Sequence, residues 1–256
     1  MRLTKGDIDF FRRNGFLPVP DVVSAGRLRA MRERVEALCE HWESEEARRL
    51  GVQQEADAGG AVAVKTSATV RKLSFLAQHE PFFKQYISDP ALLDLVEALL
   101  GTPLALYADE AFLKPPHYGS AKLPHQDNAY FGVRPDDALL TVWCALDDAT
   151  VDNGCLHYIA GSHLRGRLEH KPVPGTPHQV PDDVDPDEAV AVPIRAGGLI
   201  FHHGLVLHFS PPNRTPWWRR AYTCHFVRTD AEDFGTREAA APPIEVLRNA
   251  SGGRTD

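Results

Sequence analysis

Apolar side chains in the first hundred residues recur every three or four positions, which is the spacing of one helix face. The clearest case is the segment from about 25 to 50, which contains Leu28, Met31 and Val35 at this spacing. Further helices are predicted at residues 5–14, 80–88 and 91–100. The stretch 51–69 has no clear period and is predicted to be a mobile loop.

From residue 104 onward the pattern changes to short β-rich segments such as LALYADEAFL, LLTVWCAL and RAYTCHFVR, separated by Pro, Gly and Asp. No helical segment between them is long enough for a parallel crossover, so antiparallel pairing in a sandwich or jelly roll is expected. The domain prediction is a single domain with a helical part, a β core and a flexible C-terminal tail, at residues 1–103, 104–230 and 231–256. Within the core, the Pro-rich stretch 166–188 is expected to be a lid or binding loop.

Composition narrows the class of protein. The chain has 256 residues, 43% hydrophobic residues and a net charge of −7, which is ordinary for a globular protein and unfavourable for binding nucleic acid or an anionic membrane. No segment reaches the length of a membrane span and no signal peptide is apparent. The four cysteines form no CxxC pair, so reduced thiols in a cytoplasmic protein are predicted.

The stretch LPHQDNAYF contains two candidate metal ligands, His125 and Asp127. If the chain is extended here, alternate side chains point to the same face. Two histidines and one carboxylate form the site of non-haem Fe(II) oxygenases, so the third ligand should be a second, distant histidine on another strand. Residues 198–226 offer four candidates, His202, His203, His208 and His225.

Several motifs together resemble the phytanoyl-CoA dioxygenase family of Fe(II)- and 2-oxoglutarate-dependent oxygenases. HQD is followed at a distance by H-x-S-x-x-N-(x5)-R, which begins at His208. AFLKPP (111–116), the tryptophan eighteen residues after His125 and DNGCLHYIAGSH (152–163) also match the family pattern. The resemblance covers roughly residues 5–228 and implies a mainly β fold, a double-stranded β-helix (jelly roll, cupin-like) core with N-terminal helices.

The resemblance also implies roles for individual residues. The iron ligands would be His125, Asp127 and His208, with His203 as the competitor for the third position. The residues implied to bind 2-oxoglutarate are Arg219, Ser210, Trp143 and, by a looser match, Lys72. Arg219 is preferred to Arg220 on spacing, and a guanidinium grips a carboxylate through two parallel hydrogen bonds. His202 and His225 are expected to form hydrogen bonds, and Asn213 is expected to hold a turn.

The substrate pocket is less well defined by the sequence. Asn128, Tyr130 and Phe131 follow the ligand pair and either line the substrate pocket or serve the fold. Phe209 departs from the small residue common after the distal histidine, which affects the pocket and leaves the ligand set intact. No basic patch suited to coenzyme A is apparent.

The implied activity is that of a dioxygenase that uses Fe(II), 2-oxoglutarate and O2 to hydroxylate or otherwise oxidise a small molecule, with release of succinate and CO2. Asp127 argues against halogenation, because related halogenases have a small residue there. The alternatives are a 2-oxoglutarate-independent metal enzyme and a non-catalytic small-molecule binding protein on the same fold. The expected assembly is a monomer or a homodimer.

Overall fold

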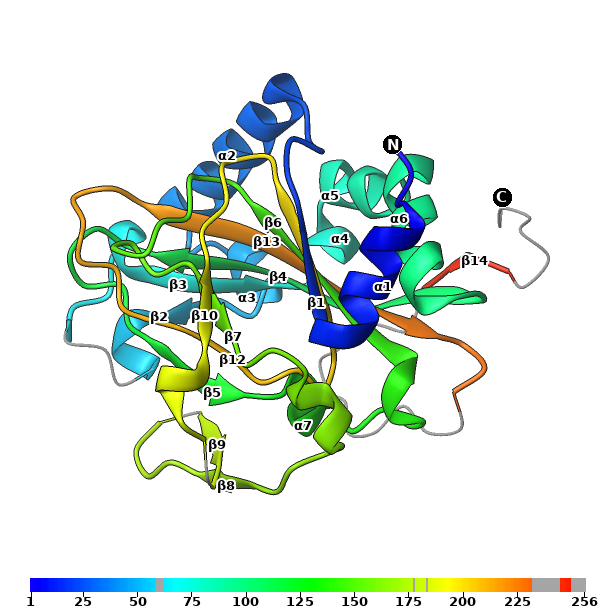
Figure 1. The fold of residues 1–256 in the computed structure, drawn as a ribbon. Coiled ribbons are helices and arrows are strands. Elements are labelled where there is room, and N and C mark those ends of the chain that lie inside the picture. The colour runs from blue at the N-terminus through cyan, green and yellow to red at the C-terminus, as the bar shows by residue number, and fades with distance from the viewer. Residues whose placement is uncertain (59–61, 177, 183, 232–244, 250–256) are drawn as a thin grey trace.

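Two antiparallel β-sheets form the centre of the molecule, and helices from the first hundred residues cover the outer face of the large sheet (Figure 1). The computed structural model describes residues 1–58, 62–176, 178–182, 184–231 and 245–249. The inner face of the large sheet packs on the small sheet through residues such as Trp143, Ile200 and Tyr158. This is the mainly β jelly-roll arrangement that the sequence predicts.

The strands of the large sheet follow a spatial order that differs from their order in the chain. This order is β1 (Phe16–Val19), β11 (Leu199–His203), β6 (Leu139–Ala145), β13 (Arg219–Arg228), β4 (Leu104–Lys114), β3 (Val70–Ser74) and β2 (Gln53–Gln54). The small sheet consists of β10 (Val190–Val192), β7 (Leu156–Tyr158), β12 (His208–Ser210) and β5 (Lys122–His125). A separate hairpin is formed by β8 (His170–Pro172) and β9 (Gln179–Pro181).

Strand β13 shows how the alternation of the sequence sorts side chains between two environments. Tyr222 and Cys224 point toward the helices and join the main hydrophobic core. Arg219 and Thr223 point to the other face, where a cavity lies between the two sheets. Because successive strand residues alternate between faces, one strand contributes both to the core and to the cavity.

Helices form in each of the regions where the sequence predicts them. The α-helices are α1 (Lys5–Asn14), α2 (Ala25–Glu40), α3 (Glu45–Arg49), α4 (Leu76–His79), α5 (Pro81–Ile87), α6 (Pro90–Leu100) and α7 (Asp127–Phe131). Thr4 and Asp7 form a reciprocal capping box at the start of α1. Gly15 ends α1 with φ of 81°, in the left-handed region that glycine tolerates best.

Two expectations for this region require correction. The helix predicted over 25–50 ends at Glu40, and a second short helix, α3, follows it. The side chain of Ser44 caps the start of α3 by accepting a hydrogen bond from the Ala47 amide. The predicted loop 51–69 contains β2 and two short 3-10 helices, η1 (Glu55–Ala58) and η2 (Ser67–Thr69). Three of its residues, 59–61, lie outside the described part of the chain.

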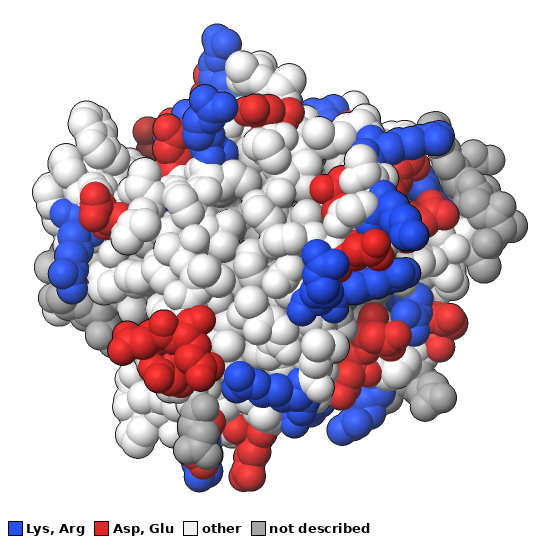
Figure 2. Space-filling view, viewed as in Figure 1, with Lys and Arg blue, Asp and Glu red and all other residues white. Residues whose placement is uncertain are grey.

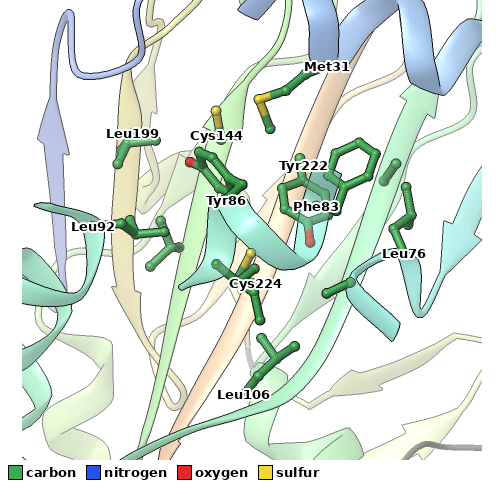
Figure 3. Close-up of a cluster of buried hydrophobic side chains, with 14 of the residues drawn as sticks. Met31, Leu76, Phe83, Tyr86, Leu92, Leu106, Cys144, Leu199, Tyr222 and Cys224 are labelled. Atoms are coloured by element: carbon green, nitrogen blue, oxygen red, sulfur yellow. The ribbon is translucent and has the colours of Figure 1, made fainter. Parts of the chain in front are cut away.

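The main core fills the space between the helices and the large sheet. Figure 3 shows Met31 and Phe83 from the helices packed against Cys144, Tyr222 and other residues of the central strands. Residues buried in α2, such as Leu28 and Met31, lie on the face that the sequence period indicated. This layer makes the large sheet a rigid base for the side chains on its inner face.

The long segment 166–188 and the C-terminal segment are the least regular parts of the described chain. The first contains the β8–β9 hairpin and ends in a 3-10 helix, η5 (Pro186–Glu188). The sequence predicts a flexible tail over 231–256. Within it, β14 (Glu245–Arg248) pairs with β4, so the prediction is wrong for these residues. Residues 232–244 and 250–256 of that tail lie outside the described residues. The two remaining 3-10 helices are η3 (Asp136–Ala138) and η4 (Ser162–Arg165).

Two composition-based expectations are met within the described residues. All four cysteines are buried and free, as predicted. Among the described helices, none combines the length and the apolar character needed to cross a bilayer. On the face shown in Figure 2, acidic and basic side chains are interspersed.

Candidate metal centre

Three side chains from separate elements converge in the cavity between the sheets. His125 ends strand β5, Asp127 begins helix α7 and His208 begins strand β12. The two histidines are cross-strand partners. Ligand atoms of the three residues all lie within 4.8 Å of one another, and all three side chains are buried. The expectation that His125 and Asp127 lie on one extended strand is not met. His125 ends β5, and the chain turns into α7 at Asp127.

Hydrogen bonds set the orientation of both imidazole rings. His125 Nδ1 lies 2.8 Å from the carbonyl oxygen of Leu123, and His208 Nδ1 lies 3.0 Å from that of Val206. Each Nδ1–H therefore donates to the backbone, and each Nε2 presents its lone pair to the cavity. The Nε2 atoms of His125 and His208 lie 3.4 and 3.6 Å from Asp127 Oδ1.

The second carboxylate oxygen of Asp127 is held by other residues. Thr141 Oγ1 donates to Asp127 Oδ2 at 2.6 Å, and His202 Nε2 donates to the same oxygen at 2.9 Å. His225 Nδ1 lies 2.9 Å from Thr141 Oγ1, and the Tyr158 hydroxyl lies 2.9 Å from His202 Nδ1. Oδ2 is therefore fully occupied, and Oδ1 remains directed toward the two histidines.

The electrostatics favour the protonation states that a metal requires. Burial, followed by the nearby His208 and Lys122, lowers the pKa of His125 well below its usual value and keeps its ring neutral. Burial alone would raise the pKa of Asp127, but His208, His125 and His202 together hold it well below its usual value. A neutral imidazole and an ionised carboxylate are the metal-binding forms. Two imidazoles and one carboxylate on one side of a cavity suit Fe(II).

The remaining candidate histidines play other parts. His203 accepts a hydrogen bond from the Leu205 amide at 3.0 Å and faces His163, so it lies outside the ligand cluster. His202 and His225 form the hydrogen bonds that the sequence predicted for them. The structure thus brings His208, and not His203, to His125 and Asp127.

The environment of Arg219 suits a carboxylate ligand. Its side chain is buried, its guanidinium carbon lies 5.6 Å from the Trp143 ring centre, and Nη2 lies 3.5 Å from Ser210 Oγ. Its Nε is buried without a hydrogen-bond partner, and no carboxylate of the described residues forms an ion pair with it. Burial lowers the pKa of Arg219 to about 10, which leaves it charged at neutral pH. A buried, unpaired guanidinium is costly unless an anion binds it.

Arg220 is already paired on the opposite face of β13. Its Nε lies 2.7 Å from Asp147 Oδ2 and its Nη2 lies 2.9 Å from Asp147 Oδ1, and it also contacts Glu36. Because successive strand residues face opposite sides, Arg220 forms ion pairs outside the cavity while Arg219 faces into it. This is the arrangement on which the choice of Arg219 over Arg220 was based.

Two lysines near this site differ from what the sequence implied. Lys72 lines the same cavity, but its Nζ lies 3.2 Å from Glu110 Oε1 in an ion pair. Lys114, which the sequence reasoning missed, is the cross-strand neighbour of Arg219. Its buried Nζ donates to the carbonyl oxygens of Ser120 and Ser210. The only sequence signal for Lys114 is its position in the family-like AFLKPP segment.

The cavity around these residues has a volume of about 290 Å³. Tyr130 and Phe131 line it, as does Phe209, whose ring stacks on His157. Asn128 does not line it. The Asn128 amide instead closes the turn after α7 by bonding both the N–H and the carbonyl of Val133, so its assignment to the substrate pocket is corrected to a structural role.

Asn213 holds a turn, as predicted, by donating to the carbonyl oxygens of Lys114, Pro115 and Trp217. Gln126, the middle residue of HQD, was not singled out from the sequence. It is fully buried and bonds Gly166, Leu168 and Leu205, which fixes the start of the segment 166–188 beside the metal ligands.

The chain is similar in sequence to known proteins. A sequence profile of the family described as Phytanoyl-CoA dioxygenase (PhyH) matches residues 11–221. The Mus musculus protein named phytanoyl-CoA dioxygenase domain-containing protein 1 is 34% identical over 180 residues, which are 67% of this chain and 62% of that protein. The match thus spans less than two thirds of the mouse protein. The Homo sapiens peroxisomal phytanoyl-CoA dioxygenase is 26% identical over 255 residues, which are 95% of this chain and 74% of that protein.

Solved structures show the same fold. The non-haem alpha-ketoglutarate-dependent carbocyclase SnoK from nogalamycin biosynthesis superposes with a TM-score of 0.72 at 26% identity, over 95% of this chain and 96% of SnoK. EvdO2 from Micromonospora carbonacea var. aurantiaca, complexed with 2-oxoglutarate, superposes with a TM-score of 0.68 at 28% identity, over 94% of this chain and 96% of EvdO2. The chain belongs to the phytanoyl-CoA dioxygenase family of Fe(II)- and 2-oxoglutarate-dependent oxygenases, and the prediction of this family is confirmed.

Proposed function

We propose that this chain is a non-haem Fe(II)- and 2-oxoglutarate-dependent dioxygenase that hydroxylates a small organic molecule. His125, Asp127 and His208 would hold the iron, and Arg219 with Ser210 would bind the distal carboxylate of 2-oxoglutarate. When bound, the metal and cosubstrate supply the oxidising chemistry, in which 2-oxoglutarate and O2 are converted to succinate and CO2 while one oxygen atom enters the substrate.

One observation carries this proposal. The three ligand side chains point into the same cavity as a buried guanidinium that has no carboxylate partner among the described residues. A hydrolytic zinc enzyme has no need for this guanidinium, whereas a dicarboxylate cosubstrate bound to iron requires a cation at its far end. The 2-oxoglutarate in EvdO2, a structure of the same fold, supports the assignment.

The protein itself performs three tasks in this reaction. The backbone bonds of His125 and His208 orient both rings so that Nε2 faces the metal position. Thr141 and His202 hold Asp127 in one orientation, which keeps one carboxylate oxygen directed at the metal position. The apolar walls of the cavity, which include Leu156 and Phe209, exclude water and thereby strengthen the charged contacts inside it.

Asp127 also bears on the outcome of the reaction. Its carboxylate occupies the position that a halide would need, which favours hydroxylation over halogenation. Lys72 and Trp143 are proposed as further cosubstrate contacts. Lys72 would have to exchange its ion pair with Glu110 for the cosubstrate, and Trp143 would form the wall under Arg219.

The test is an anaerobic titration of the metal-free protein with Fe(II) and then 2-oxoglutarate, followed by visible spectroscopy. A keto acid chelated to Fe(II) gives a weak charge-transfer band, which we expect for the wild type. Arg219→Ala should weaken 2-oxoglutarate binding by about tenfold to a hundredfold, because it removes a charge-assisted double hydrogen bond.

The exposed Arg195, which pairs with Asp21 on the surface, provides a matched control. Arg195→Ala should bind 2-oxoglutarate like the wild type. A wild-type protein that binds metal but develops no band would contradict the proposal and favour the zinc enzyme or the binding protein.

A further inference from the structure

The walls of the cavity carry a charge opposite to that of the whole molecule. The chain has a net charge of −7, and acidic and basic side chains are mixed on the face shown in Figure 2. Inside the cavity, cations outnumber carboxylates. The cations are Arg71, Lys72, Lys114, Lys122 and Arg219, and the carboxylates are Glu110 and Asp127.

This excess persists when the cofactors are considered. Glu55, which is fully buried, lies 3.9 Å from Arg71, and counting it still leaves two more basic side chains than carboxylates. Burial lowers the pKa of Lys114 well below its usual value, and leaving Lys114 out of the count still leaves one cation in excess. Fe(II) and 2-oxoglutarate carry equal and opposite charges, so binding both leaves the excess unchanged. A low-dielectric cavity with unbalanced positive charge is unfavourable unless another anion enters it.

Apart from Arg219, which is assigned to 2-oxoglutarate, Lys122 is the cavity cation that has neither an anionic partner nor a hydrogen bond to a carbonyl oxygen among the described residues. Lys72 pairs with Glu110, Arg71 with Glu55, and Lys114 donates to two backbone carbonyl oxygens. The Lys122 ammonium instead lies 4.6 Å from the centre of the Tyr130 ring, and no carboxylate of the described chain forms an ion pair with it.

Tyr130 places this ammonium near the metal position. The Tyr130 ring packs edge-on against the ligand His125, with centroids 5.6 Å apart. Its hydroxyl bonds the backbone of Gln179 in β9, at 3.1 Å to the amide and 3.4 Å to the carbonyl. Tyr130 thus connects the metal ligand, Lys122 and the hairpin of the segment 166–188.

The neighbouring His178 provides an independent observation. It lines the cavity, is only 5% exposed, and its Nδ1 is buried without a hydrogen-bond partner. Burial, followed by Lys122, Arg71 and Lys114, lowers the pKa of His178 to about 4, so the ring is neutral at physiological pH. A neutral imidazole with a free ring nitrogen can donate one hydrogen bond to an anion.

We propose that the substrate is a small molecule with one anionic group, a carboxylate or a phosphate, which binds Lys122 Nζ and His178 Nδ1. Arg71 adds positive charge behind this site. The anionic group then lies against Tyr130, and the remainder of the substrate extends past His125 toward the metal. This inference rests on the proposed function, because it assigns the second anion of a cavity whose first anion is 2-oxoglutarate.

The experiment compares matched ligands on protein loaded with Mn(II) and saturating 2-oxoglutarate. The probes are straight-chain carboxylic acids, their primary amides and monoalkyl phosphates of equal chain length, and binding is measured by calorimetry. We expect an acid or a phosphate to bind at least about tenfold more tightly than its amide, since one charge-assisted hydrogen bond contributes that much. The class of ligand that binds more tightly, carboxylic acid or phosphate, identifies the anion.

Variants of Lys122 and His178 test whether the preference for an anionic ligand arises at these two side chains. Lys122→Met should remove the preference for the anion, while its affinity for 2-oxoglutarate stays within about twofold of the wild type. His178→Leu should weaken anion binding and His178→Gln should restore part of it, because glutamine retains a donor. Lys84→Met, at an exposed position of helix α5, is the control and should behave like the wild type.

Several results would overturn the inference. These are equal binding of acid and amide, an anion preference that survives in Lys122→Met, and a complete lack of anion binding. An acid that merely competes with 2-oxoglutarate at Arg219 would show the second result. Failure of the wild type to bind 2-oxoglutarate would instead contradict the proposed function, so the two failures are distinguishable.

Discussion

At the scale of single residues, His125 and His208 differ from the other histidines in where they meet, because their local hydrogen bonds are shared by other histidines. His125 and His208 each bond the carbonyl oxygen two residues earlier, but His157 and His170 form the same local bond. That bond leaves Nε2 available for another partner, which for His170 is the backbone N–H of Gln126. Only the pairing of β5 with β12 brings two such rings together beside Asp127.

Thr141 is predicted to position the metal-binding carboxylate. Its hydroxyl donates to Asp127 Oδ2 and accepts from His225, so Thr141→Val removes the donor without changing the side-chain shape. We expect metal affinity to fall about tenfold to a hundredfold, the usual effect of losing such a partner. Anaerobic Fe(II) titration measures this, Thr141→Ser should retain affinity, and unchanged binding in Thr141→Val would refute the role.

At the scale of elements, the segment 166–188 is attached to the metal site through Gln126. The buried Gln126 amide donates to the carbonyl oxygens of Gly166 and Leu205 and accepts from the Leu168 amide. The backbone N–H of Gln126 also donates to His170 Nε2 at 3.0 Å. The residue between His125 and Asp127 therefore determines where the cavity wall that carries His178 begins.

Gln126→Ala should loosen this wall. The loss of three buried hydrogen bonds should lower the free energy of unfolding by about 3 kcal/mol, measured in urea. Hydrogen exchange at the Leu168 amide should accelerate more than the global change requires, because its acceptor is removed. Gln78→Ala, on an exposed position of α4, is the control, and an unaltered Leu168 exchange rate would count against the attachment.

Sequence patterns were sufficient for elements whose signals are local. The helices predicted at 5–14 and 91–100 and the alternation that separates Arg219 from Arg220 all depend on neighbouring residues. The positions of Lys114, Lys122 and His178 depend on strand register and on a long segment. Nothing within a short window indicates that these side chains share a cavity, so the sequence could not predict them.

At the scale of the whole molecule, the large sheet separates two kinds of buried charge. On its inner face, the charged groups line the cavity. On its outer face, Asp109 of β4 is buried among the helices, where it accepts hydrogen bonds from the Ala77 amide at 2.9 Å and from the Tyr222 hydroxyl at 2.7 Å. No cation of the described residues forms an ion pair with Asp109.

Asp109 should therefore make stability depend on pH. Burial raises its pKa from 3.8 to about 6, even though the bonds from Tyr222 and Ala77 oppose the shift. Since the folded state binds this proton more tightly than the unfolded state, the group destabilises the fold when ionised. The cost is absent below pH 3.8, develops between pH 3.8 and 6 and is complete above pH 6, where it reaches about 3 kcal/mol.

The comparison with Asp109→Asn isolates this contribution, because other titrating groups are common to both proteins. We expect the free energy of unfolding of the variant, relative to the wild type, to rise by up to about 3 kcal/mol between pH 4 and pH 7. Asp152→Asn, at an exposed carboxylate, should show a flat difference over the same range. A flat difference for Asp109→Asn as well would mean that its carboxyl group titrates alike in the folded and unfolded chain, and that its burial under α4 carries no electrostatic cost.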